Sequence, residues 1–253
     1  QWLAHVLSEA ERPTYLRAGV NYEVTGANEW RHAPSLTALA EKPLRLYLRA
    51  WPDGPPHALA TERSAVPMAL TETRDLEDRT DAGWRPANEL VAGDIEARGV
   101  SFLSEPFDEA VDLAGRLRGE LDFTINKQDA DLVMTLYEER ATGEHVQLFD
   151  PAFAFRLSYA ADRVHRHLLV AGVRQQLPFQ SDRMIGHRLE AGSRLLLTLG
   201  INQRADQQIN YGAGNDVSEE SIEDAGAPLR IRWHEGSFIE IPSVGDRDRG
   251  RDQ

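Results

Sequence analysis

The feature that most constrains the fold of this chain is a repeated two-residue alternation of apolar and polar side chains. In residues 44–50, Leu44, Leu46 and Leu48 alternate with Arg45, Tyr47 and Arg49. Such alternation is typical of a strand with one face against a core. The pattern recurs along the chain with turn-forming residues in between, which predicts an antiparallel β-sandwich. The expected strands are 20–25, 44–50, 99–106, 119–126, 130–140, 153–160, 182–190, 192–202, 228–236 and 237–244.

Two segments depart from this alternation. Residues 1–10 predict a short amphipathic helix, because their large apolar side chains fall on one helical face: Trp2, Leu3, Val6 and Leu7. Residues 52–98 lose the periodicity, and we expect a long ordered connection with one helical turn, held in place by Trp84 and other anchors.

Turn signals predict how some strands connect. The short link 127–130 predicts a hairpin between the strands on either side of it, and Glu235-Gly236 predicts a terminal hairpin. Gly26 ends the first strand, and we expect a loop after it with Trp30 and His32 as anchors. No pairing partner for the strand 20–25 is evident, so we expect it to be an exposed edge or to pair with a second copy of the chain.

Composition excludes several classes of function. The net charge of −13 disfavours nucleic acid and anionic membranes as partners, because phosphate contacts need clustered Lys and Arg. The absence of Cys excludes disulfides and thiolate chemistry. No apolar run approaches the ~20 residues of a membrane span. We therefore expect a soluble bacterial protein, cytoplasmic or exported; Gln1 in place of an initiator Met suggests a processed chain or part of a longer one.

Nucleophilic catalysis finds no support in the sequence. No G-x-S-x-G nucleophile elbow occurs, so no serine is placed as in an α/β-hydrolase. Ser101, Ser104 and Ser193 lie in strand or turn contexts without a nearby base, and we interpret them as turn-capping or solvent-facing. We expect no catalytic residue in this chain.

The pair His165 and His167 is the strongest candidate for a metal site. On a strand, residues i and i+2 share a face, so both imidazoles could meet one ion, with His145, His187 or a carboxylate as the third ligand. Arg163 and Arg166 flank the pair and disfavour a cation. We therefore expect a charged, solvated segment, without metal or cofactor.

The carboxylates give no acid/base or calcium signature. Adjacent residues on a strand point to opposite faces, so Glu138-Glu139 and Glu219-Glu220 do not form two-carboxylate sites, and we interpret them as surface charge. No calcium loop is indicated either, because the regular spacing of its acidic ligands is missing from Asp129, Asp131, Asp216 and Glu219.

The loop "INYGAGNDVSEE" (209–220) has the most unusual chemistry, with Tyr211, Asn215 and Asp216 around two glycines. It could bind a ligand or partner at the end of the sandwich. The alternative is a structural connection in which Asn210 and Asn215 satisfy backbone groups, and we favour that interpretation. Ligand-binding residues stay unassigned.

Three stretches together resemble a known enzyme family. "VNYEVTGANEWRHAPSL" (20–36) is similar to the segment that closes the catalytic domain of the cocaine esterase/X-Pro dipeptidyl-peptidase (CocE/NonD) hydrolases, where an "MG-x-x-x-W" motif is common; here Thr25 replaces the Met. Residues 102–139 and 179–203 resemble the C-terminal jelly roll of that family. The resemblance covers about residues 15–244.

This resemblance implies a non-catalytic C-terminal domain. The serine, aspartate and histidine of the family lie upstream of the matched strand, so none is carried over to this chain. Residues 1–36 would be the tail of an absent α/β-hydrolase domain, 37–244 a jelly-roll β-sandwich of the galactose-binding-like kind, and 245–253 a mobile charged tail. The family cleaves esters, amides or X-Pro peptides by a covalent serine mechanism. The implied partner is the upstream hydrolase domain, with a homo-oligomer also possible.

Two other functions remain open. An independent carbohydrate-binding module would need an exposed aromatic platform, with Trp51, Trp84 and Trp233 as candidates, although Trp233 is in phase with core positions. A metal hydrolase would need a metal held by His165 and His167.

Overall fold

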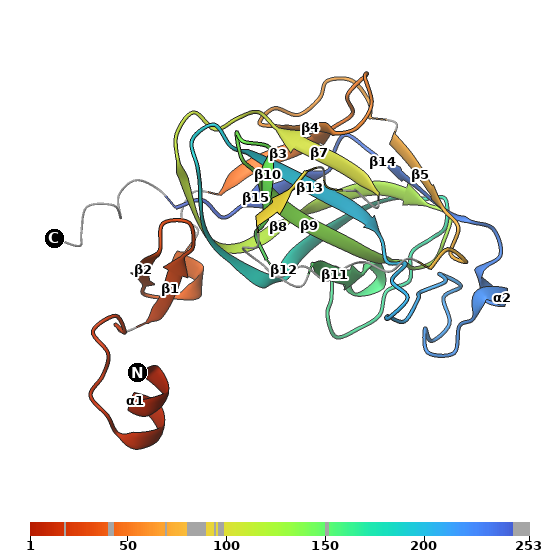
Figure 1. The fold of residues 1–253 in the computed structure, drawn as a ribbon. Coiled ribbons are helices and arrows are strands. Elements are labelled where there is room, and N and C mark those ends of the chain that lie inside the picture. The colour runs from red at the N-terminus through yellow and green to blue at the C-terminus, as the bar shows by residue number, and fades with distance from the viewer. Residues whose placement is uncertain are drawn as a thin grey trace.

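The structure, a computed structural model, describes residues 1–17, 19–39, 43–68, 70–79, 90–93, 95, 99–149 and 152–244. It is mainly β, as predicted, with a large sandwich and a small hairpin (Figure 1). Its elements are α1 (Trp2–Ser8), β1 (Val20–Val24), β2 (Glu29–Ala33), η1 (Leu36–Ala38), β3 (Leu44–Arg49), β4 (His57–Ala60), β5 (Leu70–Arg74), β6 (Leu90–Ala92), β7 (Val100–Ser104), β8 (Val111–Ile125), β9 (Asp131–Glu139), β10 (Glu144–Gln147), β11 (Phe153–Arg156), η2 (Leu157–Tyr159), β12 (Arg174–Leu189), β13 (Arg194–Ile201), α2 (Ile222–Ala225), β14 (Leu229–Trp233) and β15 (Phe238–Ile241).

The first layer of the sandwich is built around the long strand β8. One side of β8 pairs with β12, and the other side pairs with β14 and β15. Beyond these lie β5, paired with β14, and β3, paired with β15. The outer edge of this layer is therefore β12.

The second layer is built around β9 and β13. Strand β13 pairs with β7 and β9, and β9 pairs further with β10 and β11. The two layers are continuous in hydrogen bonding, because β3 pairs with β4 and β4 runs parallel to β7. Strand β13 is buried on both faces, as its apolar sequence predicted.

The core lies between these layers, and the alternation of the sequence points into it. Leu121, Phe123 and Ile125 of β8 are at most 1% exposed, and Leu132 and Met134 of β9 are fully buried. These inward positions are those expected from the sequence. The apolar side of each alternating strand turns to the core, because apolar area removed from water provides the main stabilisation.

Two predicted hairpins are wrong. Strands β8 and β9 belong to different layers, so the link 127–130 crosses between layers. Strands β14 and β15 do not pair with each other: both run along β8 in one direction, with Trp233 opposite Phe123 and Phe238 opposite Glu120. The residues around Glu235-Gly236 form an irregularity in one long strand.

The predicted loops also contain strands. The residues after Gly26 form β2, which pairs with β1 in a two-stranded sheet, so the first strand has its partner in the chain. The connection 52–98 contains β4, β5 and β6, which cross-strand pairing stabilises despite their weak periodicity. Trp84 and the tail 245–253 lie outside the described residues.

The predicted helix α1 is present and lies apart from the sandwich, beyond the hairpin (Figure 1). None of its residues is buried. Within the described part of the chain, no helix is long and apolar enough to cross a membrane.

Candidate docking site between the hairpin and the sandwich

The β1–β2 hairpin attaches to the free edge of β12 through Thr25. The Thr25 backbone N–H donates to the Gly186 carbonyl at 3.0 Å, and the Arg188 N–H donates to the Thr25 carbonyl at 2.9 Å. Gly186 lets the hairpin come this close, because a Cβ there would lie 2.6 Å from the Glu23 carbonyl oxygen. Backbone pairing therefore fixes the hairpin on the sandwich.

A buried polar contact continues inward from Thr25. The Thr25 hydroxyl lies 2.9 Å from Nδ1 of His187, and Nε2 of His187 lies 2.9 Å from a carboxylate oxygen of Glu138. His187 is 2% exposed and Glu138 is fully buried. We call Thr25, His187 and Glu138 the polar clamp; it links the hairpin to β12 in one layer and β9 in the other.

The polar clamp resembles a hydroxyl–imidazole–carboxylate relay but is closed to substrates. An ionised carboxylate only accepts, so Nε2 of His187 carries the proton shared with Glu138. The Thr25 hydroxyl lies 2.8 Å from the Gly186 carbonyl, to which it donates. The burial of His187 and Glu138 leaves the imidazole without a solvent-exposed face for a reacting group, so we interpret the clamp as structural.

The charge of Glu138 is compensated within the site. Burial pushes the pKa of Glu138 upward, but the hydrogen bonds from His187 and from the Glu190 backbone N–H outweigh it and hold the pKa below its ordinary value. The Glu190 N–H lies 2.7 Å from the second carboxylate oxygen. Glu138 was predicted to be surface charge, and that is wrong: it is in phase with the inward residues of β9.

A second charged contact holds the hairpin from its outer face. Arg188 forms a bidentate pair with Asp112, with distances of 2.6 and 3.1 Å, and Arg31 of β2 lies 2.8 Å from the same carboxylate. Asp112 is 2% exposed. Burial raises its pKa, but the hydrogen bond from Arg188 and the charge of Arg31 outweigh burial and hold the pKa below its ordinary value.

Apolar packing completes this interface. Ala33 and Leu39 form a small buried cluster with Ala114 of β8, and Val20 and Tyr22 pack against it. The hairpin thus covers one end of the outer face of the first layer.

The histidines considered for a metal site do not come together. His165 and His167 lie near Asp162, at 2.8 and 3.7 Å, on an exposed loop and not on a strand. His145 contacts Glu139 at 3.3 Å, and His187 belongs to the polar clamp. Among the residues with described placement, no group of three or more His, Cys, Asp or Glu could hold a metal ion.

The serines considered as nucleophiles have structural contacts. The Ser104 hydroxyl donates to the Glu105 carbonyl at 2.8 Å and accepts from the Leu195 N–H at 2.9 Å. The Ser193 hydroxyl donates to the Glu190 carbonyl at 2.6 Å. Ser101 lies in β7, 8% exposed.

The loop 209–220 is organised around Glu220. One carboxylate oxygen accepts from the backbone N–H groups of Tyr211 and Gly212, and the other accepts from those of Gly214 and Asn215, at 3.0 to 3.1 Å. Glu220 was predicted to be surface charge; it is instead the internal acceptor of the loop.

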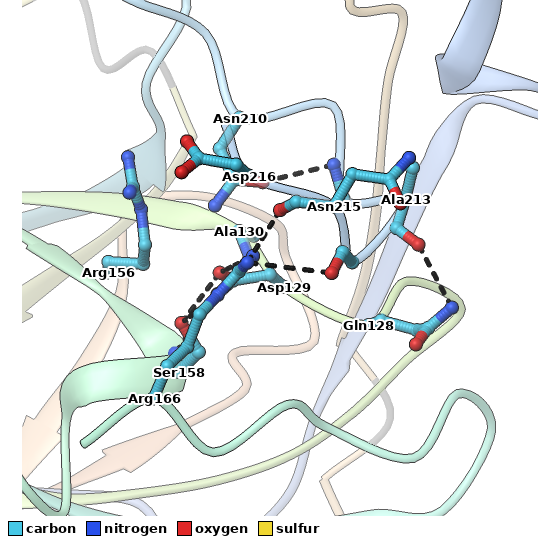
Figure 2. A network of polar contacts seen from close by, with 12 residues as sticks. Gln128, Asp129, Ala130, Arg156, Ser158, Arg166, Asn210, Ala213, Asn215 and Asp216 are labelled. Carbon is cyan, nitrogen blue, oxygen red and sulfur yellow. Dashed lines mark hydrogen bonds and ion pairs between the residues drawn. The ribbon is translucent and has the colours of Figure 1, made fainter. Parts of the chain in front are cut away.

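Neighbouring residues hold this loop from outside (Figure 2). Arg166 donates to a carboxylate oxygen of Asp129 at 3.1 Å and to the Asn215 carbonyl at 2.5 Å, and the Ser158 hydroxyl donates to Asp129 at 2.6 Å. Gln128 donates to the Ala213 carbonyl at 3.0 Å. These contacts favour the structural interpretation of the loop. Asn210 accepts from the Gly212 N–H as expected.

Of the tryptophans considered for a sugar platform, Trp233 is fully buried in the core, as its phase predicted, and Trp51 is 51% exposed. Trp84 lies outside the described residues.

The sequence matches a family model over residues 14–202, a stretch that includes the hairpin, both sides of the polar clamp and most of the sandwich. That model describes the X-Pro dipeptidyl-peptidase C-terminal non-catalytic domain. The chain belongs to this family. The resemblance found in the sequence is thereby confirmed, and this X-Pro dipeptidyl-peptidase C-terminal domain is non-catalytic.

Solved structures share its fold. An aminopeptidase from the marine sediment archaeon Thaumarchaeota archaeon is 19% identical, with a TM-score of 0.76, over 96% of this domain and 43% of that chain. An α-amino acid ester hydrolase is 16% identical, with a TM-score of 0.69, over 88% of this domain and 41% of that chain. A CocE/NonD family hydrolase from Staphylococcus aureus is 16% identical, with a TM-score of 0.64, over 96% and 44%.

These likenesses establish the fold of the domain. The domain spans less than half the length of each of these three chains. No curated protein matches it. The more specific galactose-binding-like assignment stays a prediction.

Sequence reasoning missed the polar clamp, although a signal was present. His187 falls in phase with the buried Ile185 and Leu189, and a polar side chain at a core position must be paired. The sequence does not reveal the partner, because Glu138 lies far along the chain in the other layer.

Proposed function

We propose that this domain packs on an α/β-hydrolase domain of the same protein and helps to shape its substrate cleft. The parent enzyme cleaves an acyl bond in an ester, an amide or an X-Pro peptide through a covalent serine intermediate. The proposal is supported by membership of a non-catalytic C-terminal family and by a fold shared with chains more than twice as long.

The observation that carries the proposal is the uncovered apolar face of α1. Trp2, Leu3, Val6 and Leu7 are 52%, 61%, 55% and 76% exposed. Apolar side chains gathered on one face of a helix stabilise it only when another surface covers them. A hydrolase domain beside α1 would supply that surface.

The hairpin interface gives this contact a mechanical role. The polar clamp and the Asp112 pairs fix the hairpin on the sandwich, and α1 precedes the hairpin by a short segment. A domain that covers α1 is thereby held at a defined position relative to the first layer. In this proposal residues 1–36 carry the transition from the hydrolase domain, and residues 37–244 form the sandwich.

The proposal is tested first by the coding sequence upstream of Gln1, which should contain a G-x-S-x-G followed by an Asp and a His. The chain alone should not turn over p-nitrophenyl acetate or an X-Pro p-nitroanilide. Turnover that persists after treatment with a serine-directed inhibitor would contradict the assignment as non-catalytic.

Binding provides the second test. The hydrolase domain, produced separately, should form a one-to-one complex with this chain in analytical ultracentrifugation; self-association of the complex would reveal the proposed homo-oligomer. Leu7→Glu should weaken the complex at least about tenfold, because it places a charge in an apolar contact. Ser8→Glu adds the same charge on the opposite side of α1 and should leave binding unchanged. Equal effects of both changes would place the hydrolase domain elsewhere.

A further inference from the structure

The outer face of the first layer carries a groove next to the hairpin. It has a volume of about 650 Å³ and is formed by β3, β8, β12, β15 and the segment after η2. A groove of this size accommodates a small organic molecule. The side chains that give it its chemistry are Arg45, Arg116, Arg118, Arg163, Glu120 and Glu240.

Three of these side chains form a row across adjacent strands. Arg45, Glu240 and Arg118 lie directly opposite one another in the registers of β3, β15 and β8. Arg45 donates to one oxygen of Glu240 at 2.6 Å, and Arg118 donates to the other at 2.6 Å. One carboxylate therefore serves two guanidinium groups, which leaves one positive charge uncompensated within the row.

Arg116 adds a second uncompensated charge. It lies two residues before Arg118 on β8 and so on the same face, about 7 Å away. Arg116 is exposed; its backbone pairs with Met184 of β12, but no hydrogen bond or ion pair joins its guanidinium to another described residue. Arg163 reaches the groove from its other side, where it donates to the Gln180 carbonyl at 2.5 Å. The carboxylate of Glu120 offsets part of this charge.

This groove is positively charged on a strongly acidic chain. Four arginines and two glutamates leave an excess of positive charge there, while the whole chain carries −13. A net negative molecule repels long polyanions, so the local charge suits a small anion better than nucleic acid. Guanidinium groups bind carboxylates and phosphates through paired hydrogen bonds.

Aromatic rings border the charged groove. Phe179 lines both this groove and an adjoining hollow of about 190 Å³, which also contains Phe153 and Phe155. The three rings stack with centroids 4.9 to 6.2 Å apart. Phe153 and Phe179 belong to the core, at 3% and 6% exposed, so the partly exposed ring of the groove is Phe238, with the Arg45 guanidinium 4.2 Å from its centroid. A ligand with an anionic group among the arginines could place an apolar body beside Phe238.

We propose that this groove is a binding site for a small organic anion, a carboxylate or a phosphate ester with an apolar body. Arg116 provides the principal free guanidinium, Arg118 and Arg163 provide further donors, and Glu120 limits the affinity. The site is separate from the hairpin interface and does not depend on the proposed hydrolase partner.

The test is a titration of the chain with phenyl phosphate, benzoate and inorganic phosphate at low salt, followed through the arginine Nε–Hε resonances in NMR spectra. We expect saturable shifts confined to the groove arginines, strongest with the aromatic anions. Arg116→Gln should weaken binding about tenfold, the value of one charge-assisted hydrogen bond. Glu120→Gln should strengthen it by about threefold, because a competing negative charge is removed.

Arg230→Gln is the matched control, since Arg230 is exposed on β14 outside the groove. It should leave the affinity unchanged. Shifts spread over all surface arginines, or equal loss in the Arg116 and Arg230 variants, would mean an adventitious ion only. Saturable binding of polyglutamate without binding of the small anions would replace the proposed ligand by an acidic protein segment. The backbone of Arg116 pairs with β12 in any variant, and its guanidinium has no hydrogen bond or ion pair with a described residue, so Arg116→Gln should not prevent folding.

Discussion

Nε2 of His187 lies 2.9 Å from the carboxylate of Glu138, and this contact joins the two layers of the sandwich. Glu138→Ala should lower the free energy of unfolding by about 3 kcal/mol, because it leaves a buried imidazole without its partner. Urea denaturation measures the loss. Glu139→Ala is the control: Glu139 is only half-buried, and its partner His145, at 3.3 Å, also contacts the Gly93 carbonyl at 3.0 Å, so the expected loss is under about 1 kcal/mol.

Replacing both members of the pair separates charge from packing. Glu138→Leu combined with His187→Leu should recover much of the stability lost in Glu138→Ala, because no unpaired buried polar group remains. A double variant that is less stable than Glu138→Ala would show that Thr25 also needs the imidazole.

Stability should fall in acid through Glu138 and Asp112. Both have pKa values below their ordinary values of 4.5 and 3.8, so the folded state favours their ionised forms. The stability that they contribute is complete above those ordinary values and is lost as the pH falls through the lower folded-state pKa values. Urea titrations from neutral pH to about pH 3 should show this decline, and Asp112→Asn should flatten it. If the free energy of unfolding of the Asp112→Asn variant falls with pH as steeply as that of the unchanged chain, Asp112 does not contribute to the acid sensitivity.

Glu72 should make the protein less stable as the pH rises, which is opposite to the effect of Glu138 and Asp112. It is 6% exposed, and burial raises its pKa above the ordinary value of 4.5, with only partial compensation by Arg74. Because the folded-state pKa is raised, stability is lost as the pH rises through it. Glu72→Gln should therefore raise the free energy of unfolding at neutral pH by about 1 kcal/mol. The exposed Glu77→Gln should have no effect; a destabilised Glu72→Gln would show that the pair with Arg74 outweighs burial.

Gly186→Ala should detach the hairpin without unfolding the sandwich. The new Cβ would lie 2.6 Å from the Glu23 carbonyl oxygen, so the β1 backbone must move. Hydrogen exchange should rise in residues 20–33 and stay unchanged in β9. In Gly143→Ala the new methyl group has open space, although the φ of +82° strains it. That variant should keep the protection of the hairpin, and equal loss in both variants would mean a global effect.

The fold class could be predicted because alternation records which face of a strand is buried. Leu121, Phe123 and Ile125 face the core as expected. Strand β2 escaped detection because its sequence, Glu29 to Ala33, shows no alternation; its pairing with β1 and the contact of Arg31 with Asp112 stabilise it.

The partners of strands were harder to predict than the strands. Glu235-Gly236 is a turn signal, but residues 234–237 stay beside β8, between the paired segments β14 and β15. The Asp122 N–H donates to the Ser237 hydroxyl at 3.0 Å, and the His234 N–H donates to the Asp122 carbonyl at 2.8 Å. Such long-range bonds leave no local pattern. Glu138 was misassigned to the surface although it is in phase with the inward residues of β9, because its partner His187 lies far along the chain.

The position of β14 and β15 has a consequence for biosynthesis. The last strand segments of the chain, residues 229–241, lie between β8 and the pair β5 and β3 (Figure 1). A ribosome must therefore translate the chain as far as residue 241 before the middle of the first layer can assemble. Premature termination shortly before Leu229 would leave β8 with an open side, a product that invites aggregation and proteolysis.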